Sequence, residues 1–342
     1  MSLALKLQLA EGFREVAPRR CGHRLLWEEN GGFRLDETDF AATRDLGHLG
    51  GVDCPIAVDT ARGLAWAYCC QYRLGVRDYS EIREFDLGTG RTRRLVRLGL
   101  HQWAIWLLAH WPDANSLLTL IATDTRAGAI HIRHHLAMID LQQGSLHLVA
   151  LPRDAFSPLA ACARRHWLIF HGAEGTHHVS FTGRKLRTLP PGGPLGRGGD
   201  IHPQKPLALI GGDGLWLWNL EDGSLRRLRE RGQYPRWTPD GRGCWFSESS
   251  SDLFHFDLET GAEKRLLRIA GNNFTEINYS RPIAADAEGR HLALPLTRLL
   301  KTDPNVRETS SMLARLHRLC VVDLEAREAW MSSGYARHLA WW

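Results

Sequence analysis

No run of eighteen apolar residues occurs in the 342-residue chain, so no segment is predicted to cross a membrane as a helix. The N-terminal stretch 1–20 lacks the apolar centre of a secretory signal, because Lys6, Glu11 and Arg14 interrupt it. The seven cysteines are odd in number and include no Cys-x-x-Cys pair, which favours reduced thiols. We therefore expect a cytoplasmic protein without a membrane partner, although a chain whose export signal had been removed would show the same pattern.

Signatures of several enzyme classes are also missing. There is no Gly-x-Ser-x-Gly elbow for a serine hydrolase and no His-Glu-x-x-His for a zinc peptidase. The glycine-rich stretch PPGGPLGRGG (190–199) lacks the Gly-Lys-Ser/Thr of a nucleotide-binding loop, so it is interpreted as a connection. Nucleotide-dependent and triad chemistry are therefore not expected.

Charge is mild and evenly distributed. The chain carries 43 Lys and Arg against 38 Asp and Glu, a net charge of +5, with no basic tail or stripe. A nucleic-acid partner is therefore not expected. The content of 44% hydrophobic residues is typical of a folded chain with a sizeable core.

The sequence contains an internal repeat. A strand-like run, then Asp-Leu or a close substitute, a turn with Gly and a second run form a hairpin, because Asp caps such turns and Gly accepts positive φ. The copies lie at 33–40, 83–95, 137–149, 179–189, 217–228, 254–266 and 320–331.

Further strand pairs precede these hairpins, as in YPRWTPDGRGCWFSES (234–249), where Pro-Asp-Gly forms the turn. Each unit then has four strands and about 49 residues, the period of a propeller blade. The inner strands are predicted near 52–58, 101–108, 157–163, 200–208, 234–238, 279–285 and 335–342.

The prediction is thus an all-β, seven-bladed β-propeller forming a single domain over 1–342. The ring is expected to close by pairing the C-terminal strand, 334–342, with the N-terminal residues 22–47, which hides both sheet edges. Seven blades of four strands leave no strand position for residues 1–16. Their alternating part, 4–16, either pairs on the outside of a blade or indicates an eighth blade.

The stretch 234–266, with its Pro-Asp-Gly turn and Asp-Leu-x-x-Gly hairpin, resembles the blade motif of TolB-type, WD-like propellers. Five other units match this motif in part. The resemblance implies the propeller fold and does not by itself imply an activity.

Long connections are predicted to gather on one face of the propeller. Antiparallel connectivity brings the links between blades and the links between second and third strands to the same side. The predicted insertions 71–81, 123–133 and 298–315 belong to that side. Long loops on a rigid scaffold usually carry function, so we expect the working face there.

Polar residues start the inner strands on that face, and three consecutive units carry Tyr-x-Arg. Residues two apart in a strand share a face, so each Tyr and Arg would point together towards the channel mouth. Converging guanidinium groups suit carboxylate or phosphate, and the alternative of contacts between blades stays open. The predicted ligand-binding residues are Asp200, Tyr234, Arg236, Tyr279, Arg281, Tyr335 and Arg337.

The leading interpretation is therefore a binding or interaction protein that presents a cationic mouth to an anionic small molecule or a protein partner and needs no cofactor. A weaker likeness to the single-domain oligogalacturonate lyases implies an alternative, a metal-dependent lyase acting on uronate oligosaccharides. In that alternative His101, Gln102 and His202 would hold a divalent metal, Mn or Ca. His202 or His338 would abstract a proton while Arg281 neutralises the substrate carboxylate.

Two other groups of residues resemble binding sites but have a structural interpretation. His131, His134, His135, His177 and His178 lack diagnostic metal spacing and are interpreted as ordinary strand residues. Tryptophans within apolar strands are interpreted as packing between blades. The recurrent acidic or amide residue of the hairpins is assigned to turn capping; it stands at Asp86, Asp140, Asn219, Asp257 and Asp323.

Overall fold

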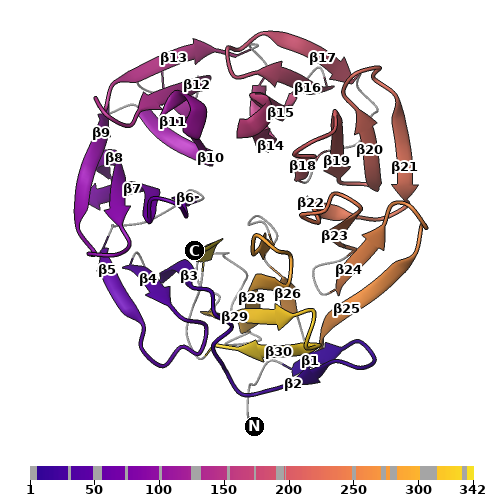
Figure 1. The fold of residues 1–342 in the computed structure, drawn as a ribbon. Coiled ribbons are helices and arrows are strands. Elements are labelled where there is room, and N and C mark those ends of the chain that lie inside the picture. Colours follow the sequence, from indigo (N-terminus) through magenta and orange to yellow (C-terminus); the bar gives the residue numbers. More distant parts are fainter. Residues whose placement is uncertain are drawn as a thin grey trace, which may run out of the picture.

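The structure is a computed structural model, and seven sheets radiate from a central axis like the blades of a propeller (Figure 1). It describes residues 6–29, 32–48, 56–73, 76–99, 102–124, 132–151, 155–172, 175–189, 196, 198–248, 252–270, 275–277, 283–300, 314–332 and 337–342.

Each blade is an antiparallel sheet of four strands in sequence order from the inside outwards, with blade 1 built from both ends of the chain. Blade 1 is β31 (Arg337–Trp341), β3 (Leu25–Glu29), β4 (Gly32–Asp36) and β5 (Arg44–His48). Blade 2 is β6 (Ala57–Asp59), β7 (Leu64–Arg73), β8 (Val76–Asp86) and β9 (Thr92–Leu98). Blade 3 is β10 (Gln102–Trp111), β11 (Ser116–Asp124), β12 (Ile132–Asp140) and β13 (Leu146–Ala150). Blade 4 is β14 (Ala155–Cys162), β15 (Trp167–Gly172), β16 (Gly175–Ser180) and β17 (Lys185–Leu189).

The remaining blades follow the same plan. Blade 5 is β18 (Gly199–Ile201), β19 (Leu207–Gly211), β20 (Leu215–Asn219) and β21 (Leu225–Arg229). Blade 6 is β22 (Gln233–Trp237), β23 (Gly243–Ser247), β24 (Asp252–Asp257) and β25 (Glu263–Ala270). Blade 7 is β26 (Thr275–Ile277) and β27 (Ala284–Ala285), which both pair with β28 (His291–Leu300), then β29 (Ala314–Asp323) and β30 (Glu328–Met331). The fold class and the blade number are confirmed, and the described inner strands lie near their predicted ranges; residues 52–55 and 279–282 of two of these ranges lie outside the described residues.

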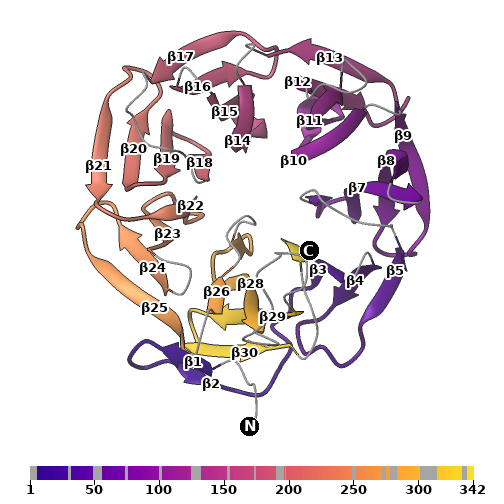
Figure 2. The same ribbon diagram turned by 180° about the vertical axis from the view of Figure 1, so that it is seen from behind.

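The ring closes as predicted. β31 pairs with β3, and the register places Leu25 opposite Trp341 and Leu26 opposite Ala340. Figure 2, the view from behind, also shows the C-terminus beside β3 at the inner edge of blade 1. Closure covers the inner edge of β3, which would otherwise be unpaired.

The N-terminal residues form two short strands outside the ring. β1 (Lys6–Leu9) pairs with the outer strand β25 of blade 6, and β2 (Arg14–Glu15) pairs with β30 of blade 7. Of the two alternatives for 4–16, pairing on the outside is correct and the eighth blade is wrong.

The core lies between the blades, with one buried apolar cluster at each of the seven interfaces among the described residues. Both faces of a blade are therefore covered, which explains why a second strand such as β23 is buried at every position. Trp66, Trp218 and Trp330 are fully buried in three of these clusters. The assignment of strand tryptophans to packing between blades is confirmed for them.

Two predicted insertions are partly strand. Residues 71–73 and 76–81 extend β7 and β8, and the expected loop shrinks to the link between these strands. Residues 298–300 and 314–315 likewise belong to β28 and β29. The long insertions predict loops here, but these strands satisfy their backbone groups by pairing with each other over their whole length. Residues 125–131 and 301–313 lie outside the described part.

The hairpin turns between third and fourth strands show the predicted capping. The Asp257 carboxylate accepts hydrogen bonds from the backbone N–H groups of Glu259 (2.9 Å) and Thr260 (2.8 Å). Gly261 follows with φ of 70°. These backbone hydrogen bonds lower the pKa of Asp257. Matching side-chain hydrogen bonds at Asp86, Asp140, Asn219 and Asp323 confirm turn capping for the whole series.

The five cysteines in the described part, Cys21, Cys69, Cys162, Cys244 and Cys320, are free. Burial raises the pKa of the Cys320 thiol to about 12, so it stays protonated. The described helices are two short 3-10 turns, Pro112–Ala114 and Ala163–Arg165. Neither is long or apolar enough to span a membrane.

Candidate functional site

The two ends of the propeller carry different connections. One end, here called the loop end, receives the links between blades and between second and third strands. The other end, here called the turn end, carries the tight turns between first and second and between third and fourth strands. Function was predicted at the loop end.

The described residues include only part of the predicted mouth. Asp200 lies in β18, and Tyr234 and Arg236 lie in the neighbouring inner strand β22. The backbone of Arg337 and His338 lies in β31, but their side chains are outside the described set. His101, Tyr279, Arg281 and Tyr335 also lie outside the described residues.

Asp200 and Arg236 meet across blades 5 and 6. Nη1 of Arg236 lies 3.5 Å from Oδ1 of Asp200, and its Nε lies 3.4 Å from the carbonyl oxygen of Ile283 in blade 7. Asp200 also accepts a 2.9 Å hydrogen bond from the backbone N–H of Trp237. Burial raises the pKa of Asp200 in spite of these partners. The pair therefore joins three blades, as the packing alternative expected.

Tyr234 departs from the alternation on which the mouth hypothesis depended. Its φ is 48°, and the pairing of β22 with β23 shifts register between Gln233 and Arg236. The ring packs against the cluster between blades 6 and 7 that contains Trp245 and Ile283. A bulge changes the face to which side chains point, so Tyr234 and Arg236 cannot be paired by simple counting.

His202 lies at the turn end, away from the predicted mouth. It opens the turn between β18 and β19, and its Nδ1 accepts hydrogen bonds from the backbone N–H groups of Gln204 (3.0 Å) and Lys205 (2.9 Å). Asp59 makes the same kind of contact in blade 2, with the N–H groups of Ala61 and Arg62. His202 is thus the turn cap of blade 5, which explains its burial without a catalytic role.

Gln102 also has a local role. Its side-chain Oε1 accepts a 3.2 Å hydrogen bond from the backbone N–H of Gly99. Its backbone carbonyl oxygen accepts a 2.9 Å hydrogen bond from the Ser80 hydroxyl. These contacts fix the link between blades 2 and 3. The described residues therefore do not bring Gln102 and His202 together.

The histidines of blade 4 are structural. Nδ1 of His177 lies 2.9 Å from the Thr188 hydroxyl. His178 packs edge to face against Trp167 and Trp218 at centroid distances of 4.7 and 6.2 Å. Burial lowers the pKa of His178 to about 4.

A cavity of about 520 Å³ lies at the turn end, where the inner strands of blades 2 and 3 approach the first turn of blade 4. Three alanines leave this space, one from each blade: Ala57, Ala109 and Ala163. Val58 and Leu108 complete the apolar wall. The volume of the cavity is within the usual range for small-molecule sites.

His110 is the polar group of the cavity wall. Its side chain is 11% exposed, its ring packs on Trp66 at 4.8 Å, and its Nδ1 lies 3.9 Å from Oδ2 of Asp59. Nε2 is buried without a hydrogen-bond partner among the described residues. Burial lowers the pKa, so the ring is neutral at pH 7.

The rim of the cavity is charged. Asp113 and Arg164 line it and are exposed. The Asp113 carboxylate lies 3.8 Å from Nε2 of His166, whereas Arg164 makes no ion pair within the described part of the chain. Among the described residues, the rim therefore offers the Arg164 guanidinium as a cation without an ion-pair partner, beside an apolar wall.

Sequence reasoning missed this cavity because its residues look ordinary in the chain. The signal is spatial: small residues recur at the ends of three successive inner strands, in PIAVD, LLAHWPD and ACARRHW. Each alanine taken alone is an ordinary residue at the end of a strand. Only the ring places them together.

Within the described part of the chain, one group of three metal-ligating side chains is close enough to hold an ion: His23, Asp286 and His291. It lies at the junction of blades 7 and 1 and includes none of the residues predicted as metal ligands. The motif Asp-x-Glu-x-x-His at 286–291 is its only sequence signal.

No family model matches the chain, and no curated protein matches it. Among solved structures the chain is similar to TolB from Acinetobacter baumannii, with a TM-score of 0.50 and 12% sequence identity. The match covers 95% of this chain and 68% of that one. At this identity the likeness shows the propeller fold alone.

Proposed function

We propose that the protein is a β-propeller that binds a small molecule with an apolar body and one anionic group in the cavity at the turn end. The observation that carries the proposal is the cavity itself, about 520 Å³ of space that three alanines of successive blades leave beside the ring of His110. A concave space with an apolar wall and few polar groups is typical of small-molecule sites.

The ligand class follows from the lining. Ala57, Val58 and Leu108 suit an apolar body. The exposed guanidinium of Arg164, which makes no ion pair with a described residue, suits a carboxylate or phosphate at the rim. An anion beside His110 favours the protonated imidazole. Affinity should therefore rise as the pH falls from 7.5 towards 6.

Benzoate tests the proposal against benzylamine, which has the same body and the opposite charge. We expect isothermal titration calorimetry to detect benzoate binding and much weaker binding of benzylamine. Arg164→Ala should weaken benzoate binding about tenfold, the effect of losing about 1.4 kcal/mol. Arg184→Ala, an exposed arginine in the outer hairpin of the same blade, is the matched control.

Val58→Phe fills the cavity and should abolish binding while the melting temperature stays near that of the wild type. Equal benzoate affinity in the wild type and Val58→Phe would show that the cavity is not the site. Preference for benzylamine would reverse the assigned ligand charge.

The cationic mouth at the loop end stays a prediction, because most of its residues lie outside the described part. The lyase alternative is not proposed here. His202, which that alternative used both as ligand and as base, has its Nδ1 engaged by two backbone N–H groups at the other end of the molecule.

A further inference from the structure

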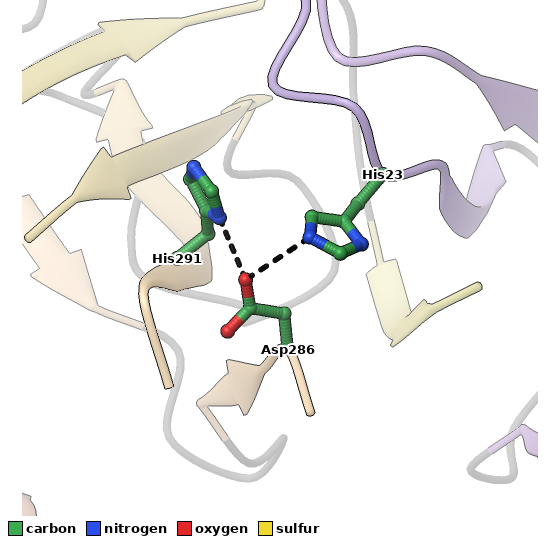
Figure 3. A group of neighbouring side chains, drawn as sticks. All are labelled: His23, Asp286 and His291. Carbon is green, nitrogen blue, oxygen red and sulfur yellow. Dashed lines mark hydrogen bonds and ion pairs between the residues drawn. The ribbon is translucent and has the colours of Figure 1, made fainter. Parts of the chain in front are cut away.

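His23, Asp286 and His291 meet at the turn end, where blade 7 lies beside blade 1 (Figure 3). Asp286 opens the turn between β27 and β28, and His291 is the first residue of β28. His23 comes from the other end of the chain, two residues before β3. The group therefore spans the place where the ring closes.

Oδ2 of Asp286 is the common point of the group. It lies 2.6 Å from Nδ1 of His291 and 3.6 Å from Nε2 of His23. Nε2 of His23 is also 3.6 Å from Oε2 of Glu288, a half-exposed residue of the same turn. Two imidazoles and one carboxylate thus converge, which is a donor set that suits zinc and related divalent metals.

The spacing fits a tetrahedral ion. Metal–ligand bonds of about 2.1 Å place two ligands of one tetrahedral ion about 3.4 Å apart. The 3.6 Å separation between Nε2 of His23 and Oδ2 of Asp286 already matches this value. The 2.6 Å contact between Asp286 and His291 is a hydrogen bond, and it must widen by about 0.8 Å when an ion replaces the shared proton.

A carboxylate also lies beside the other ring nitrogen of His291. Nε2 of His291 faces Oδ2 of Asp323 at 3.6 Å, and that oxygen accepts a 2.7 Å hydrogen bond from Arg19. A metal-bound imidazole usually donates its other N–H to a carboxylate, which fixes the tautomer and the ring. Oδ1 of Asp286 accepts a 2.8 Å hydrogen bond from the N–H of Arg290, which leaves Oδ2 pointing at the histidines.

The surroundings favour a stable site. Asp286 and His291 are 3% and 7% exposed, and the Trp341 ring lies 6.2 Å from His23 and 5.9 Å from His291. The Trp341 indole is itself held by a 3.0 Å hydrogen bond to the carbonyl oxygen of Ala284. His23 is the more accessible ligand, with a side chain 34% exposed, and provides the entry side.

We propose that His23, Asp286 and His291 bind one divalent transition metal ion, Zn²⁺ by their donor set, and that Asp323 positions His291. The ion joins the residues before β3 to blade 7. It therefore stabilises ring closure in addition to the pairing of β31 with β3. This site is independent of the cavity proposed above.

The test uses the full-length, tag-free protein, treated with chelator and kept in a phosphine reductant so that the thiols stay reduced. We expect calorimetric titration with Zn²⁺ to show one ion per chain and Zn²⁺ to raise the melting temperature. Replacement by Co²⁺ should give the visible absorption of a tetrahedral site.

His23→Ala removes a partly exposed ligand and should leave the fold intact. It should abolish the Co²⁺ band and the thermal shift, while His147→Ala, an exposed histidine in β13, should change neither. Asp323→Asn keeps its turn-capping oxygen and should weaken Zn²⁺ binding about 10–100-fold.

Equal Zn²⁺ affinity in His23→Ala and His147→Ala would place the ion elsewhere and overturn the proposal. So would a folded wild-type protein that takes up no Zn²⁺. In that case the Asp286–His291 contact is a hydrogen bond that holds the turn and nothing more.

Discussion

His178 should make the protein sensitive to acid, and replacing it by leucine should remove that sensitivity. The imidazole is 2% exposed between blades 4 and 5, between Trp167 and Trp218. Both ring nitrogens are buried without a hydrogen-bond partner within the described part of the chain. Protonation would place a positive charge there, near Arg187 of the adjacent strand.

The size of the effect follows from linkage. The pKa is lowered from 6.5 to about 4, first by burial and second by Arg187. Between these values the unfolded chain binds more protons than the folded one, so stability is complete above pH 6.5 and falls as the pH drops towards 4. At pH 5 the proton-binding polynomial of His178 in the unfolded chain is about 30 times that in the folded chain. The free energy of unfolding therefore falls by about 2 kcal/mol, or by about 1 kcal/mol if water partly screens the charge.

Urea unfolding at pH 7.5 and pH 5.0 measures this difference. The wild type should lose about 1–2 kcal/mol more than His178→Leu between the two pH values. Other histidines titrate equally in both proteins and cancel, and His147→Leu, exposed in β13, serves as control. If His178→Leu and the wild type lose the same stability, His178 is not the buried base assigned here.

Gly241→Ala should cost about 3 kcal/mol, because φ is 69° and the new Cβ would overlap Nε2 of His202. Gly261→Ala, with φ of 70° and no atom within 4 Å, should cost about 1 kcal/mol. Equal costs in urea unfolding would contradict this contact. His202→Asn should retain more stability than His202→Ala, because an amide oxygen can accept the same backbone hydrogen bonds; thermal melts compare the two. Deleting residues 337–342 should expose the edge of β3 and produce aggregates or a lower melting temperature. A truncated protein that is monomeric by gel filtration, with an unchanged melting temperature by circular dichroism, would refute the closure argument.

Much of the fold could be predicted because its signals are local. The Asp257 turn and the Pro-Asp-Gly turn at Gly241 are each set by residues a few positions apart. Repeating such units gives the blade number, and the need to hide the edges of the end strands gives the closure. The error at 71–81 has the same origin, because a long insertion resembles a loop wherever the partner strand is unknown.

The candidate sites could not be found in that way. His202 looked like a base in the sequence, and only its contacts with Gln204 and Lys205 show that it caps a turn. Tyr234 and Arg236 fitted strand alternation until a bulge, which no local signal announced, interrupted it.

The sequence by itself determined seven units of four strands and the chemistry of their turns, because these depend on neighbours along the chain. The tertiary structure alone decided which side chains meet across blades. It placed Ala57, Ala109 and Ala163 around one cavity and His23 beside Asp286. Those contacts join residues of different blades, or of opposite ends of the chain, and exist only once the ring has closed.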